Sequence, residues 1–284
     1  MTFSGVYVPL ITPFDTDGSV ALDALEALAR DVLADGATGL VALGTTGEPA
    51  SLSADEQRAV VDVAARVCRE RDAVLMIGAN TVDAVRALRD RPEAGAALCL
   101  VPPFLRPGAA GVVAYFEALA AASPVPVVVY HVPYRTGQQL PAAALRRLAA
   151  IDGVAGVKRA VGGIDAATVE LMADPPPGFS VLGGEDAIVS PLLALGAHGA
   201  ILASAHVATD RFAELVRAWQ AGDAVRARAV GHPLAGLAQA LFAEPNPTVI
   251  KAVLHARGRI PTAAVRLPLV PAGAGSVEAA LRRV

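Results

Sequence analysis

Eight short apolar runs recur along the chain and alternate with longer segments of helical periodicity. Nearly every position within a run is apolar, which is typical of parallel strands buried on both faces. Alternation with helices favours repeated βα units around a parallel sheet. The predicted strands are Gly5–Leu10, Gly39–Leu43, Val74–Gly78, Ala97–Val101, Val125–Tyr130, Val154–Lys158, Ser180–Leu182 and Ala200–Ala203.

The segments between these runs carry the spacing and end signals of helices. Ser53 and Glu56 have the spacing of a capping box, in which each residue hydrogen-bonds the backbone N–H of the other. Gly36 follows one apolar face and is expected to end that helix. The residues on this face are Leu22, Leu25, Leu28, Ala29, Val32 and Leu33, and a later face comprises Phe212, Leu215, Val216 and Trp219.

The number and spacing of the runs predict an α/β fold, a (β/α)₈ TIM barrel. Residues 1–222 supply the eight βα units, and residues 223–284 are expected to form a C-terminal helical extension packed on the barrel. An open, doubly wound sheet is the competing architecture. It is disfavoured because no GxGxxG motif follows a strand and the regular strand spacing favours closure.

Composition narrows the functional classes. The formal net charge is −3 and Lys and Arg form no long runs, so we expect no nucleic-acid partner. The uncharged stretch 187–209 is broken midway by Gly196 and Gly199, and no membrane span is expected. Cys68 and Cys99 form no CxxC motif and no metal-ligand spacing. We therefore expect a cytoplasmic protein without a metal site.

Lys158 is the first candidate for chemistry. The chain has two lysines among its 24 Lys and Arg residues, so arginine serves nearly everywhere else as the cation. Lys158 ends an apolar strand and points to the opposite side from Val157 and Arg159. Burial in a barrel lowers an amine pKa, and a free amine can attack a ketone to form an imine. The alternative is a lysine that reaches solvent or pairs with a carboxylate.

Other polar residues follow the predicted strands, at the barrel end where active sites lie. Tyr130 precedes Lys158 by 28 residues, about one βα unit, and its phenol can transfer a proton. Thr45 and Thr46 lie between two glycines, where backbone N–H groups can bind a carboxylate. Arg135 can clamp a carboxylate with its planar guanidinium. Each also has a purely structural interpretation, namely a core-capping tyrosine, a simple turn or a surface arginine.

The chain resembles the dihydrodipicolinate synthase / N-acetylneuraminate lyase family. The likeness extends from PLITPF at 9–14 to the C-terminal segment, and the mutual spacing of its motifs is far more specific than any single one. These motifs are GTTGE at Gly44–Glu48, YxxPxRTG at Tyr130–Gly137, GVK at Gly156–Lys158, EPNPxxxK at Glu244–Lys251 and RLPLVP at Arg266–Pro271.

This resemblance implies roles for the candidates. Lys158 is expected to form a Schiff base with a pyruvate-type 2-oxo acid, so no separate cofactor is expected. Tyr130 and Thr45 are expected to relay protons, and Thr46 to hold the pyruvyl carboxylate. Lys251, in the appended helices, is expected to be structural and remote from the strand ends. Two further positions that line the pyruvate pocket are Gly184 and Ile201. The resemblance also implies a homodimer or homotetramer.

Within the family, Arg135 resembles the residue by which the synthases bind the carboxylate of L-aspartate semialdehyde. The expected reaction is then condensation with pyruvate to 4-hydroxy-tetrahydrodipicolinate, in lysine biosynthesis. The synthases usually carry two tyrosines after the fourth strand, whereas this chain has Phe104 and Leu105. At these positions the chain resembles family members that act on 2-oxo-3-deoxy sugar acids as dehydratases or aldolases. A non-catalytic binding barrel is the third reading. His131 alternates away from Tyr130 and is not expected to replace the missing hydroxyl.

The resemblance also predicts the response to L-lysine. In lysine-inhibited relatives the effector binds at a dimer interface, through side chains that follow GTTGE, the third strand and the fourth strand. Here Ala54 and Gln57 follow GTTGE, Asn80 and Asp83 follow the third strand, and Phe104 lacks a tyrosine hydroxyl. We expect this chain to be insensitive to lysine feedback.

Overall fold

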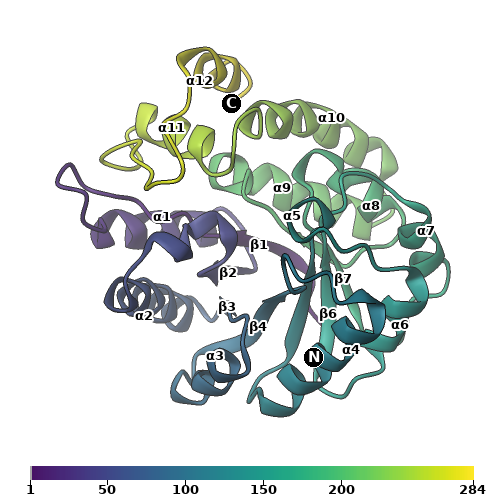
Figure 1. The fold of residues 1–284 in the computed structure, drawn as a ribbon. Coiled ribbons are helices and arrows are strands. Elements are labelled where there is room, and N and C mark those ends of the chain that lie inside the picture. Colours follow the sequence, from purple (N-terminus) through teal and green to yellow (C-terminus); the bar gives the residue numbers. More distant parts are fainter. Residues whose placement is uncertain (1) are drawn as a thin grey trace.

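A computed structural model describes residues 2–284, and its eight parallel strands close into a barrel in the order β1 to β8 (Figure 1). Closure comes from β1, which pairs with β2 on one side and β8 on the other. The predicted TIM barrel is confirmed, and the open sheet is excluded. The strands are β1 Gly5–Pro9, β2 Gly39–Ala42, β3 Val74–Gly78, β4 Ala94–Leu100, β5 Val127–His131, β6 Val154–Arg159, β7 Ser180–Gly183 and β8 Gly199–Ile201.

β3 matches its prediction at both ends, and the other strands differ from theirs by one to three residues at one end or both because pairing partners set the strand ends. β4 begins at Ala94, three residues before the predicted start, because Ala94 already pairs with Leu75 on β3. β5 and β6 each extend one residue further, to His131 and Arg159, which pair with each other. Local hydrophobicity does not reveal such partners.

Helices surround the barrel and form its outer layer (Figure 1). The capping box of α2 is present, with the Glu56 backbone N–H donating to Ser53 Oγ. Gly36 adopts a positive φ of 101° directly after the first helix and its cap residue. The helices of the barrel are α1 Leu22–Ala34, α2 Ala54–Arg71, α3 Val82–Arg86, α4 Gly108–Ala122, α5 Pro133–Thr136, α6 Ala142–Ala149, α7 Ala166–Ala173, α8 Val189–Ala194 and α9 Ala205–Gln220, with 3₁₀ turns η1 Thr45–Gly47, η2 Pro49–Ser51, η3 Ala87–Asp90 and η4 Asp186–Ile188.

The core has two layers because successive strand residues face opposite sides. Val127, Val129 and Val157 pack in the large layer between strands and helices. Val128 and Tyr130 belong to a smaller cluster inside the barrel. Lys158 alternates with Val157, so its side chain lies on the inner side.

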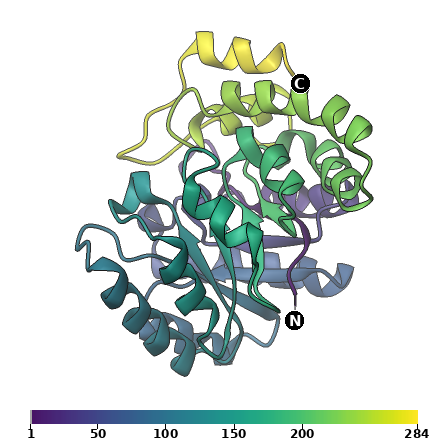
Figure 2. The ribbon, with the colours of Figure 1, turned by 90° about the vertical axis from the view of Figure 1, so that its right-hand side faces the viewer.

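Three C-terminal helices continue the chain beyond α9: α10 Ala224–Leu241, α11 Thr248–Ala256 and α12 Ala274–Leu281. Figure 2 shows them gathered at one end of the barrel, with the N-terminus toward the other end. Residue 1, part of the predicted barrel segment 1–222, lies outside the described residues. Across residues 2–284, no helix has the length and apolar character needed to cross a membrane.

Candidate active site

The ends of β5 and β6 place Tyr130 and Lys158 side by side. The two residues are register partners in the sheet. The Nζ atom of Lys158 lies 4.3 Å from the centroid of the Tyr130 ring. Both side chains are buried, with 6% of each residue exposed. A phenol and an amine therefore meet inside the barrel at the carboxyl ends of its strands.

All seven predicted site residues line one small pocket at this end of the barrel. The pocket has a volume of about 20 Å³. It gathers residues from five strand ends and from the segment after α10, so the fold and not local sequence assembles it. The predicted residues in its lining are Thr45, Thr46, Tyr130, Arg135, Lys158, Gly184 and Ile201, and the others are Tyr134, Asp186, Ala203, Phe242 and Asn246.

Burial controls the charge of Lys158. Desolvation lowers the pKa of its amine to about 8, and the neighbouring Asp186 carboxylate opposes that shift. Gly184 makes room for the side chain, because a Cβ atom there would lie 2.6 Å from Lys158 Cε. The amine is thus enclosed, and with this pKa roughly one tenth of it is unprotonated at pH 7.

Tyr130 keeps its proton over a wide pH range. Burial raises the pKa of its phenol, and the charge of Arg135 partly offsets this shift. A protonated phenol beside an amine can donate to an oxygen that develops negative charge. The arrangement fits a proton donor for a carbonyl that Lys158 attacks.

The turn after β2 supplies the polar wall of the pocket. Thr45–Gly47 forms the 3₁₀ turn η1, and Thr46 is buried. Its Oγ1 accepts a 2.9 Å hydrogen bond from Nδ2 of Asn246. The Oδ1 atom of Asn246 is buried and has no hydrogen-bond partner among the described residues. Asn246 was not predicted as a site residue, and its signal is the EPNP motif.

Asp186 is a second pocket residue that the sequence analysis missed. It is 4% exposed, and its Oδ2 accepts a 2.6 Å hydrogen bond from the Ser204 backbone N–H. Burial raises the pKa of its carboxyl group to about 6, although the Ser204 contacts and Lys158 act in the opposite direction. A carboxyl group that titrates near neutral pH therefore lies beside the Lys158 amine.

Arg135 lies at the rim, where the inner pocket meets a larger cavity of about 320 Å³. Its Nε donates to the Tyr134 hydroxyl at 3.3 Å, and the guanidinium is 5.5 Å from that ring's centroid. Thr45, Arg135 and Asn246 line both spaces. Arg266, from the C-terminal segment, adds a second cation to the outer cavity. The inner pocket and the larger cavity are therefore neighbours that share three lining residues, and Arg135 is the shared cation.

Lys251 does not lie remote from the strand ends, and that prediction is wrong. Its Nζ lies 2.8 Å from Oε1 of Glu48, directly after η1. The two side chains are 0% and 3% exposed. The second Glu48 oxygen accepts a 2.9 Å hydrogen bond from the Arg266 backbone N–H. Lys251 is separated from Glu48 by 203 residues, so no local pattern shows the pair.

The loop after β4 provides no hydroxyl at the positions of the expected tyrosines. Phe104 and Leu105 are 89% and 81% exposed in the single chain. Neither lines the Lys158 pocket.

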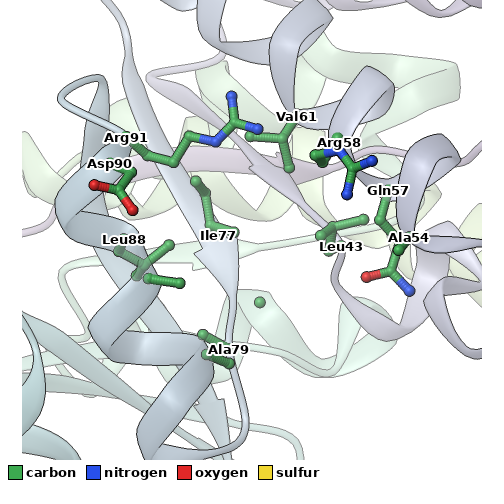
Figure 3. A pocket seen from close by; sticks show the side chains of 13 residues that line it. Leu43, Ala54, Gln57, Arg58, Val61, Ile77, Ala79, Leu88, Asp90 and Arg91 are labelled. Atoms are coloured by element: carbon green, nitrogen blue, oxygen red, sulfur yellow. The ribbon is translucent and has the colours of Figure 1, made fainter.

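A separate cavity of about 460 Å³ lies outside the barrel between α2 and the α3–η3 segment (Figure 3). Its floor is aliphatic, and the polar groups of Gln57, Arg58, Asp90 and Arg91 stand around it. Among the described residues that line it there is no Lys, Tyr, His or Cys. Its size exceeds that of the Lys158 pocket, but it lacks an amine or phenol for imine chemistry.

In residues 2–284 no group of three or more His, Cys, Asp or Glu side chains is placed to hold a metal ion.

Comparisons with known proteins agree with this geometry. The model of the dihydrodipicolinate synthetase family matches residues 2–281. The 4-hydroxy-tetrahydrodipicolinate synthase of Neisseria meningitidis serogroup C is 38% identical over 285 residues, which cover 98% of this chain and 97% of that protein.

Solved structures give the same result. The chloride-inhibited dihydrodipicolinate synthase from Acinetobacter baumannii, complexed with pyruvate, superposes with a TM-score of 0.93 at 31% identity and 99% coverage of both chains. A monomeric dihydrodipicolinate synthase variant superposes with a TM-score of 0.93 at 29% identity, covering 99% of this chain and 95% of that one. The chain is a lyase and belongs to the dihydrodipicolinate synthetase family.

Proposed function

We propose that the protein is a 4-hydroxy-tetrahydrodipicolinate synthase, which condenses pyruvate with L-aspartate semialdehyde through an imine on Lys158. The carrying observation is the enclosed Lys158 amine, 4.3 Å from the Tyr130 ring centroid, in a pocket that opens past Arg135. The Acinetobacter baumannii structure holds pyruvate, the substrate that we assign to the inner pocket.

The first half of the reaction uses the inner pocket. The unprotonated Nζ of Lys158 attacks C2 of pyruvate, and the ketone oxygen leaves as water, so that one C–O double bond is replaced by a C–N double bond. Tyr130 supplies a proton to that oxygen, with Thr45 beside it in the relay. Thr46 and the N–H groups of η1 hold the pyruvate carboxylate.

The second half uses the outer cavity. The positively charged imine acidifies C3 of the bound pyruvate, and loss of a C3 proton gives an enamine. C3 then bonds to the aldehyde carbon of the second substrate, whose oxygen takes a proton and becomes a hydroxyl group. The amine of that substrate attacks C2, closes the ring and releases Lys158. Arg135 clamps the second carboxylate at the rim by two parallel hydrogen bonds.

A dehydratase or aldolase acting on a 2-oxo-3-deoxy sugar acid is the second candidate. The observation that favours it is the loop after β4, where Phe104 and Leu105 provide no hydroxyl for a proton relay. Such an enzyme uses the same Lys158 imine but has no second carboxylate to recognise through Arg135.

A substrate panel with purified protein separates these two candidates. The proposal predicts turnover of pyruvate with L-aspartate semialdehyde, followed by coupled reduction of the product. Turnover of a 2-oxo-3-deoxy sugar acid without turnover of the semialdehyde would support the dehydratase or aldolase. Absence of turnover with both kinds of substrate would contradict both candidates.

We also propose that the chain assembles as dimers paired into tetramers. The exposed Phe104 and Leu105 form an apolar loop tip that a second chain can bury. The monomeric variant among the similar structures shows that this fold can also exist as a single chain. Sedimentation equilibrium is expected to give a mass of two or four chains, and a monomer over the micromolar range would contradict the proposal.

A further inference from the structure

A buried polar network lies behind the two central site residues, on the helix-facing side of β5 and β6. His131 directly follows Tyr130, and Arg159 directly follows Lys158, so both project away from the pocket. His131 and Arg159 are register partners, as Tyr130 and Lys158 are. They are 0% and 2% exposed. The network is therefore attached to the same strand ends that carry the site.

Arg159 is held from several directions. Its Nη1 lies 2.7 Å from Nδ1 of His131. Its Nη2 donates to Asp165 Oδ1 at 2.8 Å and to Thr168 Oγ1 at 2.6 Å. Asp165 also accepts from the Thr168 backbone N–H and so caps the start of α7. The guanidinium is fixed in place and presents one N–H to the imidazole.

This contact determines the tautomer of His131. A guanidinium can only donate hydrogen bonds, so Nδ1 of His131 must be the acceptor. The ring proton is then on Nε2, which lies 3.3 Å from the backbone oxygen of Gln138 and donates to it. Burial, together with the charge of Arg159, lowers the pKa of His131 to about 4. The imidazole is neutral at neutral pH and keeps this one donor direction.

The bond to Gln138 anchors the segment that carries Arg135. α5 spans only Pro133–Thr136, and a single residue, Gly137, separates it from Gln138. The Gln138 backbone N–H donates to Thr136 Oγ1 at 3.4 Å, and its side-chain Oε1 accepts from the Gly108 backbone N–H at 3.0 Å. Gln138 is thus the point where the Arg135 turn, the loop after β4 and the buried network meet.

We propose that His131 is a positioning residue that holds Arg135 at the rim of the pocket through its Nε2–H bond to Gln138. It touches no substrate and acts on the second substrate only through the Arg135 turn. The functional part of this inference rests on the proposed role of Arg135 in binding the carboxylate of the second substrate. The competing explanation is that His131 only fills space in the outer core and accepts a hydrogen bond from the buried Arg159.

Two substitutions separate the two hydrogen bonds of the ring. In His131→Asn, Oδ1 takes nearly the position of Nδ1 and accepts from Arg159, but the donor to Gln138 is lost. In His131→Gln, the amide nitrogen takes nearly the position of Nε2 and restores that donor. Loss of one neutral hydrogen bond corresponds to a factor of about three to ten.

The kinetic test compares both variants with the unmodified protein. His131→Asn is expected to raise KM for L-aspartate semialdehyde by about threefold to tenfold, with KM for pyruvate and borohydride trapping unchanged. His131→Gln is expected to restore KM for the semialdehyde. Equal changes in both KM values, or no change in His131→Asn, would overturn the proposal.

A second measurement does not depend on the identity of the substrate. Hydrogen exchange of the backbone amides of residues 135–138 is expected to accelerate in His131→Asn and to return toward the original rate in His131→Gln. Exchange in β3 serves as the internal control and is expected to stay constant. Unmodified protein that fails to use the semialdehyde contradicts the proposed function alone. Unchanged exchange in His131→Asn contradicts the positioning role alone.

Discussion

The Nζ atom of Lys158 lies over the ring of Tyr130, 4.3 Å from its centroid, where β5 and β6 end in register. The amine is therefore desolvated beside a phenol that keeps its proton. Because both residues lie at the ends of adjacent strands, their proximity does not depend on a distant loop. In the proposed reaction, the protonation state of Lys158 is therefore the first quantity that controls imine formation.

Imine formation should depend on pH through Lys158. The folded pKa of this amine is lowered to about 8, so the reactive unprotonated fraction increases as pH rises toward that value. We expect the rate of pyruvate imine formation to rise about tenfold per pH unit well below pH 8 and to level off above it. Stopped-flow trapping at saturating borohydride measures this rate. A profile that still rises steeply between pH 9 and 10 would show a normally solvated lysine.

Substitution of Arg135 should affect the two substrates unequally. Arg135→Ala removes a charge-assisted contact worth about 1.5–3 kcal/mol, which corresponds to about a tenfold to hundredfold rise in KM for L-aspartate semialdehyde. KM for pyruvate should change little. Arg147→Ala, at an exposed position on α6, is the matched control and should leave both constants unchanged. Equal increases for both substrates would make Arg135 architectural.

Breaking the buried ion pair of Lys251 and Glu48 should destabilise the fold, chiefly because the remaining charge is left uncompensated. Lys251→Met leaves the Glu48 carboxylate buried without its cation, which costs about 3–5 kcal/mol in the free energy of unfolding. The double variant Glu48→Gln/Lys251→Met removes both charges and should recover much of that loss. Urea unfolding of the three proteins tests this expectation. A double variant no more stable than Lys251→Met would show that packing, not charge, is responsible.

We expect L-lysine not to inhibit the enzyme. Ala54 and Gln57, which line the separate cavity between α2 and the α3–η3 segment (Figure 3), offer no charge to a bound zwitterion. The Asn80 side-chain oxygen already accepts from a backbone N–H at 2.7 Å, and Asp83 already pairs with an arginine at 2.8 Å. Two lost charged contacts would weaken binding by about a hundredfold or more. An activity titration decides this, and half-inhibition at submillimolar lysine would refute it.

The fold and the inner site could be predicted because their signals are local. Each apolar run and each helical segment can be recognised from its own stretch of sequence. A polar residue after such a run marks the active end of a barrel. Alternation along the sixth strand was sufficient to predict that Lys158 points into the barrel. Alternation along the fifth strand was sufficient to predict that His131 points away from Tyr130. The motif spacings then added the roles of Thr45 and Tyr130.

Contacts between distant segments could not be predicted in the same way. Asn246 reaches Thr46 across 200 residues, and Glu48 reaches Lys251 across 203. Asp186 differs from these two, because it follows β7 by three residues and the rule for polar residues after apolar runs applies to it. The roles of Asn246 and Lys251 depend on where the C-terminal helices pack. That packing is a property of the closed barrel.

Covalent trapping tests the central claim most directly. Pyruvate and borohydride should reduce the imine to a stable adduct, and peptide mapping should place it on Lys158, because this amine lies in the pocket while the Lys251 amine is paired with Glu48. Lys158→Ala should abolish trapping although it remains folded. An adduct on Lys251, or no adduct with any 2-oxo acid, would contradict the account.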